Sequence, residues 1–223
     1  MRLALTLALL ALPAHASDDC TEDAMLVFDG SGSMAEMGYN RIGEPRIFEA
    51  RRAIADAIPG LTSARDVGLI IYGPNGADEC TGIDLAFPPV PQAAARIMAA
   101  IDALQPEGST PLTASVALAA DVLRAAERPA TIVIVTDGKE TCQGAPCQLA
   151  AELAASSLDL TIHVIGFRVR AEHFTFGEMG GYEEAETVAR CLADRTGGDY
   201  VSTETAAELV AALEKTLGCA LLY

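Results

Sequence analysis

Short apolar runs alternate along this chain with longer stretches of helical periodicity. The run at 131–135, Thr-Ile-Val-Ile-Val, is β-branched throughout, which is typical of a central parallel strand. Strand and helix in turn predict a doubly wound α/β fold, with helices on both faces of a mostly parallel sheet. The predicted strands are 24–28, 66–72, 83–87, 131–135, 160–167 and 199–202, and the predicted helices are 46–58, 91–104, 113–126, 146–156, 184–195 and 206–217.

The sheet is therefore predicted to have six strands, one of them antiparallel. A Gly-Pro-Asn-Gly turn at 73–76 follows the second strand, so the third strand pairs with it as an antiparallel edge strand. Pro59 and Gly60 are expected to end the first helix, and Gly218 the last. His163 is interpreted as a core or edge histidine of its strand. No repeat, linker or change of composition divides the chain, which predicts one domain.

The N-terminus has the features of an export signal. Arg2 precedes a ten-residue apolar run at 3–12, and Ala14 and Ala16 flank His15 at a predicted cleavage site. We expect a signal peptide at 1–16 and a mature domain at 17–223, with a buried N-terminal helix as the alternative. No later segment is predicted to span a membrane, and no further domain or anchor is expected. The protein is predicted to be periplasmic or extracellular.

The chain is strongly acidic, with a net charge of −16. Such a charge repels nucleic acid and anionic membranes, so neither is an expected partner. It should attract cations, although for most of these charges solubility is a sufficient explanation.

Three segments bearing oxygen ligands lie at one edge of the predicted sheet. Asp29, Ser31 and Ser33 come directly after the first strand, Asp137 follows the strand at 131–135, and Thr110 lies in a loop before a helix. In open α/β sheets, ligands bind beyond the carboxyl ends of the strands. The sequence therefore predicts a functional site where these segments meet.

The residue types in these segments suit a hard divalent cation. Glycines separate Asp29, Ser31 and Ser33, so the backbone can turn tightly and the three side chains can converge. Hydroxyls and two carboxylates form an all-oxygen ligand set, which favours Mg²⁺ and leaves Ca²⁺ and Mn²⁺ open. Each residue alone has an ordinary explanation, with Asp29 and Asp137 as turn residues and Thr110 as a helix cap. The prediction of a metal site depends on their combination.

This combination resembles the metal-ion-dependent adhesion site (MIDAS) of von Willebrand factor type A domains, which have a Rossmann-like fold. The motif is Asp29-x-Ser31-x-Ser33 followed by Thr110 and Asp137, and the resemblance covers nearly all of 17–223, including the strand order. It implies that Ser31, Ser33 and Thr110 bind the metal directly. It implies that Asp29 and Asp137 act through waters and hydrogen bonds. One open coordination position is then left for an Asp or Glu carboxylate of a protein partner.

The resemblance predicts an exported, metal-dependent, adhesion-type binding module and not an enzyme. A rival interpretation is a metal-dependent phosphohydrolase with Asp29 as nucleophile. Against it, Ser31 stands where a second Asp would help to hold the metal, and no nucleophile–base pair, GxSxG turn or phosphate-binding glycine loop is evident. A third interpretation, an adaptor subunit of an ATP-driven machine, conflicts with export. The sequence thus predicts no catalytic residue.

The exported part contains an even number of cysteines, which favours disulfides in an oxidising compartment. A zinc site is the alternative, but no CxxC pair exists. A local bridge between Cys142 and Cys147 is expected around the turn beyond Asp137, and the resemblance to secreted bacterial type A domains supports it weakly. The six cysteines are Cys20, Cys80, Cys142, Cys147, Cys191 and Cys219.

Cys20 and Cys219 are expected to lie opposite the metal and to pair. In the domains that this chain resembles, the last helix moves with the metal site, so such a bridge predicts a binder of fixed affinity. The two remaining cysteines are predicted at opposite edges of the sheet, too far apart to bridge. Two other pairings therefore stay open, Cys80–Cys142 and Cys147–Cys191.

Overall fold

The computed structural model describes residues 22–37, 43–76, 78, 80–137, 140–167 and 189–219. The predicted signal peptide at 1–16 and Cys20 lie outside the described residues. The predicted helix at 184–195 is described only from residue 189, and residues 189–196 are helical.

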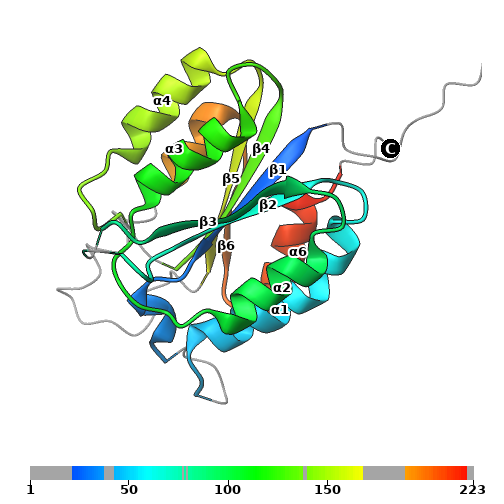
Figure 1. The fold of residues 1–223 in the computed structure, drawn as a ribbon, viewed down its shortest axis with the longest axis vertical. Helices are drawn as coiled ribbons and strands as arrows, with labels where there is room; N and C mark the ends of the chain where they lie inside the picture. Colours follow the sequence, from blue (N-terminus) through cyan, green and yellow to red (C-terminus); the bar gives the residue numbers. More distant parts are fainter. Residues whose placement is uncertain are drawn as a thin grey trace, which may run out of the picture.

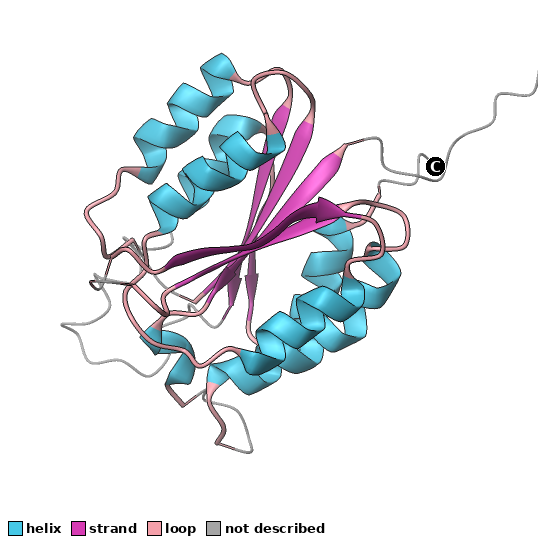
Figure 2. Ribbon diagram, viewed as in Figure 1, coloured by secondary structure: helices cyan, strands magenta, loops and turns pink. Residues whose placement is uncertain are grey.

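The centre of the molecule is a six-stranded sheet in the order β3-β2-β1-β4-β5-β6 (Figures 1 and 2). Of the described strand pairs in this sheet, only β2–β3 is antiparallel, which confirms the predicted edge strand. The strands are β1 (Asp23–Asp29), β2 (Val67–Tyr72), β3 (Ile83–Val90), β4 (Ala130–Thr136), β5 (Leu160–Phe167) and β6 (Tyr200–Thr203).

Helices cover both faces of the sheet, as the alternating pattern predicts. Side chains that alternate along β1 enter two separate cores. Leu26 and Phe28 pack on the side of α1, α2 and α6, whereas Met25 and Val27 pack on the side of α3 and α4 (Figure 1). All four are fully buried, and burying each contributes about 1.5–3 kcal/mol. The helices are α1 (Arg46–Leu61), α2 (Ala94–Ala103), α3 (Leu112–Leu123), α4 (Pro146–Ser156) and α6 (Ala206–Leu217).

The end predicted for the first helix is wrong. Helix α1 continues through Pro59 to Leu61, where Thr62 N donates to Ile58 O at 3.1 Å. Ile58 is fully buried and Leu61 packs against the same core, so tertiary packing outweighs the missing proline donor. By contrast, α6 ends at Leu217 with Gly218 as its cap, as predicted.

None of the helices in the described parts of the chain combines the length and apolarity needed to cross a bilayer.

His163 on β5 bonds the segment just before β6, and its environment predicts a pH dependence of stability. Its Nδ1 accepts a hydrogen bond from Asp199 N at 3.0 Å, and burial lowers the pKa of His163 below its usual value near 6.5. A lowered pKa in the folded state means that the unfolded state binds the proton more readily. The contribution of His163 to stability is therefore present above about pH 6.5 and is lost as the pH falls below it.

His163→Asn can keep an acceptor for Asp199 N without a titrating ring. Urea unfolding of both proteins between pH 5 and pH 7.5 should give a smaller acid-side loss of stability for the variant. Identical pH profiles would contradict this role of His163. Other titrating groups are common to both proteins and cancel in the comparison.

Candidate metal centre

Two buried aspartates lie side by side where β1 and β4 end. The strands are parallel neighbours, with Phe28 paired to Val135, so Asp29 and Asp137 emerge at the same edge of the sheet. They are 0% and 3% exposed. Burying two carboxylates this close together is unfavourable unless positive charge or hydrogen-bond donors compensate.

The segment after β1 folds back on Asp29. Asp29 Oδ1 accepts hydrogen bonds from Ser31 N at 2.9 Å and from Ser31 Oγ at 2.6 Å. A short 3-10 helix, η1 (Gly32–Ala35), follows and brings Ser33 beside Ser31, with their hydroxyl oxygens 2.9 Å apart. The aspartate thus fixes the turn that presents both hydroxyls.

Ser33 closes the link between the two strands. Its hydroxyl donates to Asp137 Oδ1 at 2.6 Å. Four of the five predicted site residues therefore lie in one run of polar contacts, Asp29, Ser31, Ser33 and Asp137, in which each hydroxyl donates to one carboxylate.

The loop that carries Thr110 contacts the loop after β1 through backbone atoms. Gly32 N donates to Gly108 O at 3.0 Å, which joins the loop before α3 to the loop after β1. Thr110 N donates to Thr141 Oγ1 at 2.8 Å, and Thr110 is only 4% exposed. Among the described residues, no hydrogen bond joins its hydroxyl to the other four side chains.

Two glycines allow these loops to approach closely. Gly73 and Gly108 have φ angles of 111° and 76°, in the region that favours glycine. A Cβ on Gly73 would lie 2.6 Å from Ser31 N, and one on Gly108 would lie 2.1 Å from Gly73 O. Any side chain at either position would push the loops after β1 and β2 and before α3 apart.

Arg46 is a member of the site that the sequence analysis missed. It is the first residue of α1 and is 5% exposed. Its Nη1 lies 2.8 Å from Asp137 Oδ2 and 3.0 Å from Ser33 O, and it donates to both. A cation at a helix N-terminus opposes the helix dipole, and that mismatch is the one sequence signal that could have pointed to it.

Tyr72 and Thr136 form a second buried layer that was also missed. Tyr72 OH donates to Thr136 Oγ1 at 3.0 Å, and Thr136 Oγ1 donates to Asp29 Oδ2 at 2.7 Å. Burial, and then the charge of Asp29, raise the pKa of Tyr72 well above its usual value. The tyrosine stays neutral and orients the far oxygen of Asp29.

The charge balance of the site suits a bound cation. Burial, and then the charge of Asp29, raise the pKa of Asp137 to about 7, although Arg46 and Ser33 act in the opposite direction. One guanidinium therefore does not fully compensate two buried carboxylates. Carboxylate and hydroxyl oxygens are ligands that hard divalent cations accept, so the residues present fit Mg²⁺, Mn²⁺ or Ca²⁺.

Comparison with known proteins decides the family. The sequence model of the von Willebrand factor type A domain matches residues 24–140, more than half of the chain. The chain belongs to the von Willebrand factor type A domain family.

This type A domain has relatives in sequence and in structure. It is 26% identical over 216 residues to the uncharacterized protein YwmD of Bacillus subtilis (strain 168), covering 92% of this chain and 90% of YwmD. It resembles the PilB minor pilin from Streptococcus sanguinis with a TM-score of 0.64 and 17% identity, covering 92% of this chain and 62% of the pilin. It also resembles proximal thread matrix protein 1 from the mussel byssus, solved with a zinc-occupied MIDAS motif, with a TM-score of 0.57 and 16% identity.

The structural similarity supports the fold alone at these identities. The match with the mussel protein covers 89% of this chain but only 48% of the mussel protein. It spans less than two thirds of the minor pilin as well. Part of each of those proteins therefore lies outside the match with this type A domain.

Two disulfides beside the site replace the local bridge that was expected. Cys80 bonds Cys142 with a Cα–Cα distance of 5.5 Å, and Cys147 bonds Cys191 with a Cα–Cα distance of 5.4 Å. The predicted Cys142–Cys147 bridge is wrong, and the pairings left open are confirmed. Cys219 is also disulfide-bonded, but Cys20 lies outside the described residues, so their pairing stays a prediction.

The error came from treating Cys142 and Cys147 as the two ends of one local turn. The connection between β2 and β3 meets the segment that follows Asp137 instead. Pro146 and Cys147 already belong to α4, and Cys147 bonds the helix at 189–196. Cys142 remains in the preceding loop, where it reaches Cys80.

Glu140 fixes the loop that follows Asp137. Its Oε2 accepts hydrogen bonds from Thr113 N at 2.7 Å and from Thr113 Oγ1 at 2.6 Å, at the start of α3. Its Oε1 accepts one from Cys142 N at 2.7 Å. This carboxylate and the Cys80–Cys142 bridge hold three loops together at the rim.

Replacing Cys80 and Cys142 by serine should lower the free energy of unfolding by about 2–4 kcal/mol. The bridge spans 62 residues, so its loss frees a long loop in the unfolded chain. Urea unfolding measures the effect. Amide hydrogen exchange should also speed up in residues 140–145 and 80–83, while α6 keeps its protection relative to the global stability. Unchanged stability and exchange would contradict the role given to this bridge.

Proposed function

We propose that this type A domain is an exported protein-binding module that depends on a divalent metal. The proposed ligand set contains three hydroxyls and two carboxylates. The observation that carries the proposal is the convergence of two buried carboxylates and two serine hydroxyls at the carboxyl edge of the sheet, with each hydroxyl donating to one of the carboxylates. The five residues of the set are Asp29, Ser31, Ser33, Thr110 and Asp137.

Each side chain has a distinct part in this proposal. Ser31, Ser33 and Thr110 offer neutral hydroxyl oxygens to Mg²⁺, with Ca²⁺ or Mn²⁺ as substitutes. Asp29 and Asp137 supply negative charge and orient the hydroxyls through hydrogen bonds. When bound, the cation provides a Lewis-acidic position for an Asp or Glu carboxylate of a protein partner. Neutral ligands suit this role because they leave most of the ion's positive charge available to the incoming carboxylate.

The contacts of Asp29 favour binding over phosphoryl-transfer catalysis. Its Oδ1 accepts hydrogen bonds from the backbone and hydroxyl of Ser31, and its Oδ2 accepts one from Thr136. The residue is fully buried. A nucleophilic carboxylate needs an oxygen that a substrate can reach, and here the whole residue is buried.

The cysteines support a location outside the cytoplasm. Two disulfides among the described residues are expected to persist in an oxidising environment such as the periplasm or the exterior. The proposal includes removal of a signal peptide at 1–16, leaving a mature domain at 17–223. Sequencing the N-terminus of the secreted protein tests this part.

A carboxylate probe tests the proposed function directly. Mn²⁺ replaces Mg²⁺, and the relaxation of water protons reports water bound to the ion. The α-amide of N-acetyl-aspartate has a free side-chain carboxylate. It should displace that water and reduce the relaxation enhancement. Its neutral isostere, N-acetyl-asparaginamide, should not. Ser33→Ala should lose the response because it removes a proposed ligand.

Two results would oppose the proposal. Equal effects of the acid and the amide would mean that no open metal position selects a carboxylate. Metal-dependent hydrolysis of a generic phosphate ester, lost in Asp29→Ala, would favour the enzyme instead.

A further inference from the structure

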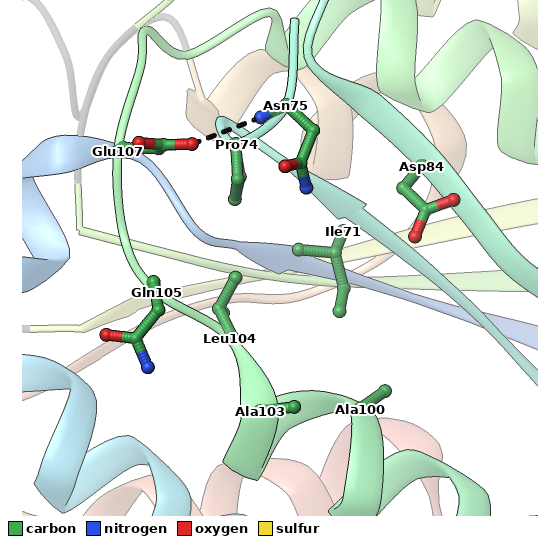
Figure 3. A pocket seen from close by; sticks show the side chains of 9 residues that line it. All are labelled: Ile71, Pro74, Asn75, Asp84, Ala100, Ala103, Leu104, Gln105 and Glu107. Carbon is green, nitrogen blue, oxygen red and sulfur yellow. Dashed lines mark hydrogen bonds between the residues drawn. The ribbon is translucent and has the colours of Figure 1, made fainter.

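A cleft of about 310 Å³ lies next to the proposed metal loops, between the β2–β3 hairpin and the end of α2 (Figure 3). Its floor is apolar and includes Ile71 and Leu104, each 7% exposed. Its rim is polar and carries the exposed carboxylates of Asp84 and Glu107. Figure 3 shows these two side chains on opposite sides of the floor.

The cleft shares backbone with the proposed metal site. Glu107 N donates to Gly30 O at 3.0 Å, and Gly30 lies between Asp29 and Ser31. A Cβ on Gly30 would lie 2.9 Å from Leu104 Cδ1, so the cleft floor also abuts this loop. A partner segment bound at the metal site therefore has the rim of the cleft close by.

The charges around the cleft are one-sided. Within the described part of the chain, neither Asp84 nor Glu107 forms an ion pair, and Glu107 only accepts a long hydrogen bond of 3.4 Å from Asn75 N. Arg51 lies nearby, but it donates to the backbone oxygens of Ile101 and Leu104 at the end of α2. The two rim carboxylates thus remain available to a cation from outside.

We propose that this cleft binds an arginine side chain of the protein partner. The methylene stem of arginine can lie on the apolar floor while its guanidinium reaches the rim. The planar guanidinium offers five donors and can form paired hydrogen bonds with a rim carboxylate, which a lysine ammonium does less well. The volume is at the lower end of the range for ligand pockets, which suits one long side chain.

This assignment deepens the proposed function. The link between the cleft and a metal-bound partner rests on that function. The capture of a guanidinium depends on the cleft alone. The two claims can therefore fail separately.

NMR titration with N-acetyl-argininamide tests the cleft. The protein is kept in EDTA, and the amide signals of Asn75, Asp84, Leu104 and Glu107 are followed. These signals should shift, and the neutral isostere N-acetyl-citrullinamide should bind at least tenfold more weakly. Asp84→Asn and Glu107→Gln should each weaken arginine binding about threefold, and the double variant about tenfold.

Asp121→Asn is the matched control. It removes the same charge from an exposed position on α3, across the sheet from the cleft, and should leave the affinity unchanged. Equal binding of the arginine and citrulline probes would overturn the proposal. So would equal arginine affinity in the double variant and the parent protein.

Calorimetry of Mg²⁺ on EDTA-free samples of the same proteins separates the two proposals. Arginine binding without any divalent binding would contradict the proposed function but not the cleft proposal. Divalent binding without selectivity for arginine would contradict the cleft proposal alone.

Discussion

Replacing Arg46 by methionine is expected to destabilise the chelator-treated protein by about 3–5 kcal/mol, because it leaves the buried carboxylate of Asp137 without its cation. Arg46 Nη1 lies 2.8 Å from Asp137 Oδ2, and both side chains are almost completely buried. Methionine preserves much of the arginine stem, so the loss reflects charge more than a cavity. Urea unfolding in EDTA measures the effect.

A saturating divalent cation should recover most of this loss. The ion supplies positive charge beside Asp29 and Asp137, so it matters more to Arg46→Met than to the parent protein. The gain in unfolding free energy on adding Mg²⁺ should therefore be larger in the variant. Equal destabilisation with and without Mg²⁺ would mean that Arg46 acts through packing alone.

Arg52→Met is the matched control for this experiment. Arg52 lies on the same helix, but its side chain is 48% exposed, and it pairs with Glu44 at the surface. Exposed ion pairs contribute little, so this variant should stay within about 1 kcal/mol of the parent protein, with an unchanged response to Mg²⁺.

The second large effect concerns metal affinity. Asp29→Asn should weaken the binding of Mg²⁺ and Mn²⁺ by about 100-fold, because Asp29 supplies negative charge and orients Ser31. The amide keeps an acceptor oxygen for Ser31 and nearly the same shape, so the fold should survive. Calorimetry measures the affinity, and circular dichroism checks the fold.

Asp121→Asn again serves as the control, because it makes the same chemical change at an exposed position on α3. Its affinity for both ions should match that of the parent protein. A folded Asp29→Asn variant with parental affinity would mean that any divalent ion binds somewhere else.

The fold could be predicted because each strand carries its own local signal. The β-branched run of β4 and the glycine-rich turn after β2 fix the parallel core and the antiparallel edge, and both are confirmed. The end of α1 could not be predicted. Packing of Leu61 against the core contributes to it, and that depends on elements far away in sequence.

The candidate site was only partly accessible to sequence analysis. Asp29, Ser31 and Ser33 adjoin in sequence, and Asp137 follows a recognisable strand, so their meeting at one edge follows from parallel topology. Arg46 was missed because its role depends on the direction in which α1 starts, relative to the edge of the sheet. The residues between Ser33 and α1 carry no pattern that fixes this direction.

The disulfides were the least predictable feature. Their pairing depends on the paths of two long connections, and periodicity says nothing about such paths. Strand positions alone left Cys80–Cys142 as one of two open pairings. In the structure the connection between β2 and β3 brings Cys80 to Cys142, in the segment that follows Asp137.

The most direct test of a metal shared by these loops is anomalous diffraction from crystals grown with Mn²⁺. We expect one strong anomalous peak in direct contact with the hydroxyl oxygens of Ser31, Ser33 and Thr110, close to Asp29 and Asp137. The peak should be absent in crystals of Asp29→Asn. A peak elsewhere, or none at saturating Mn²⁺, would contradict a metal site formed by these five residues.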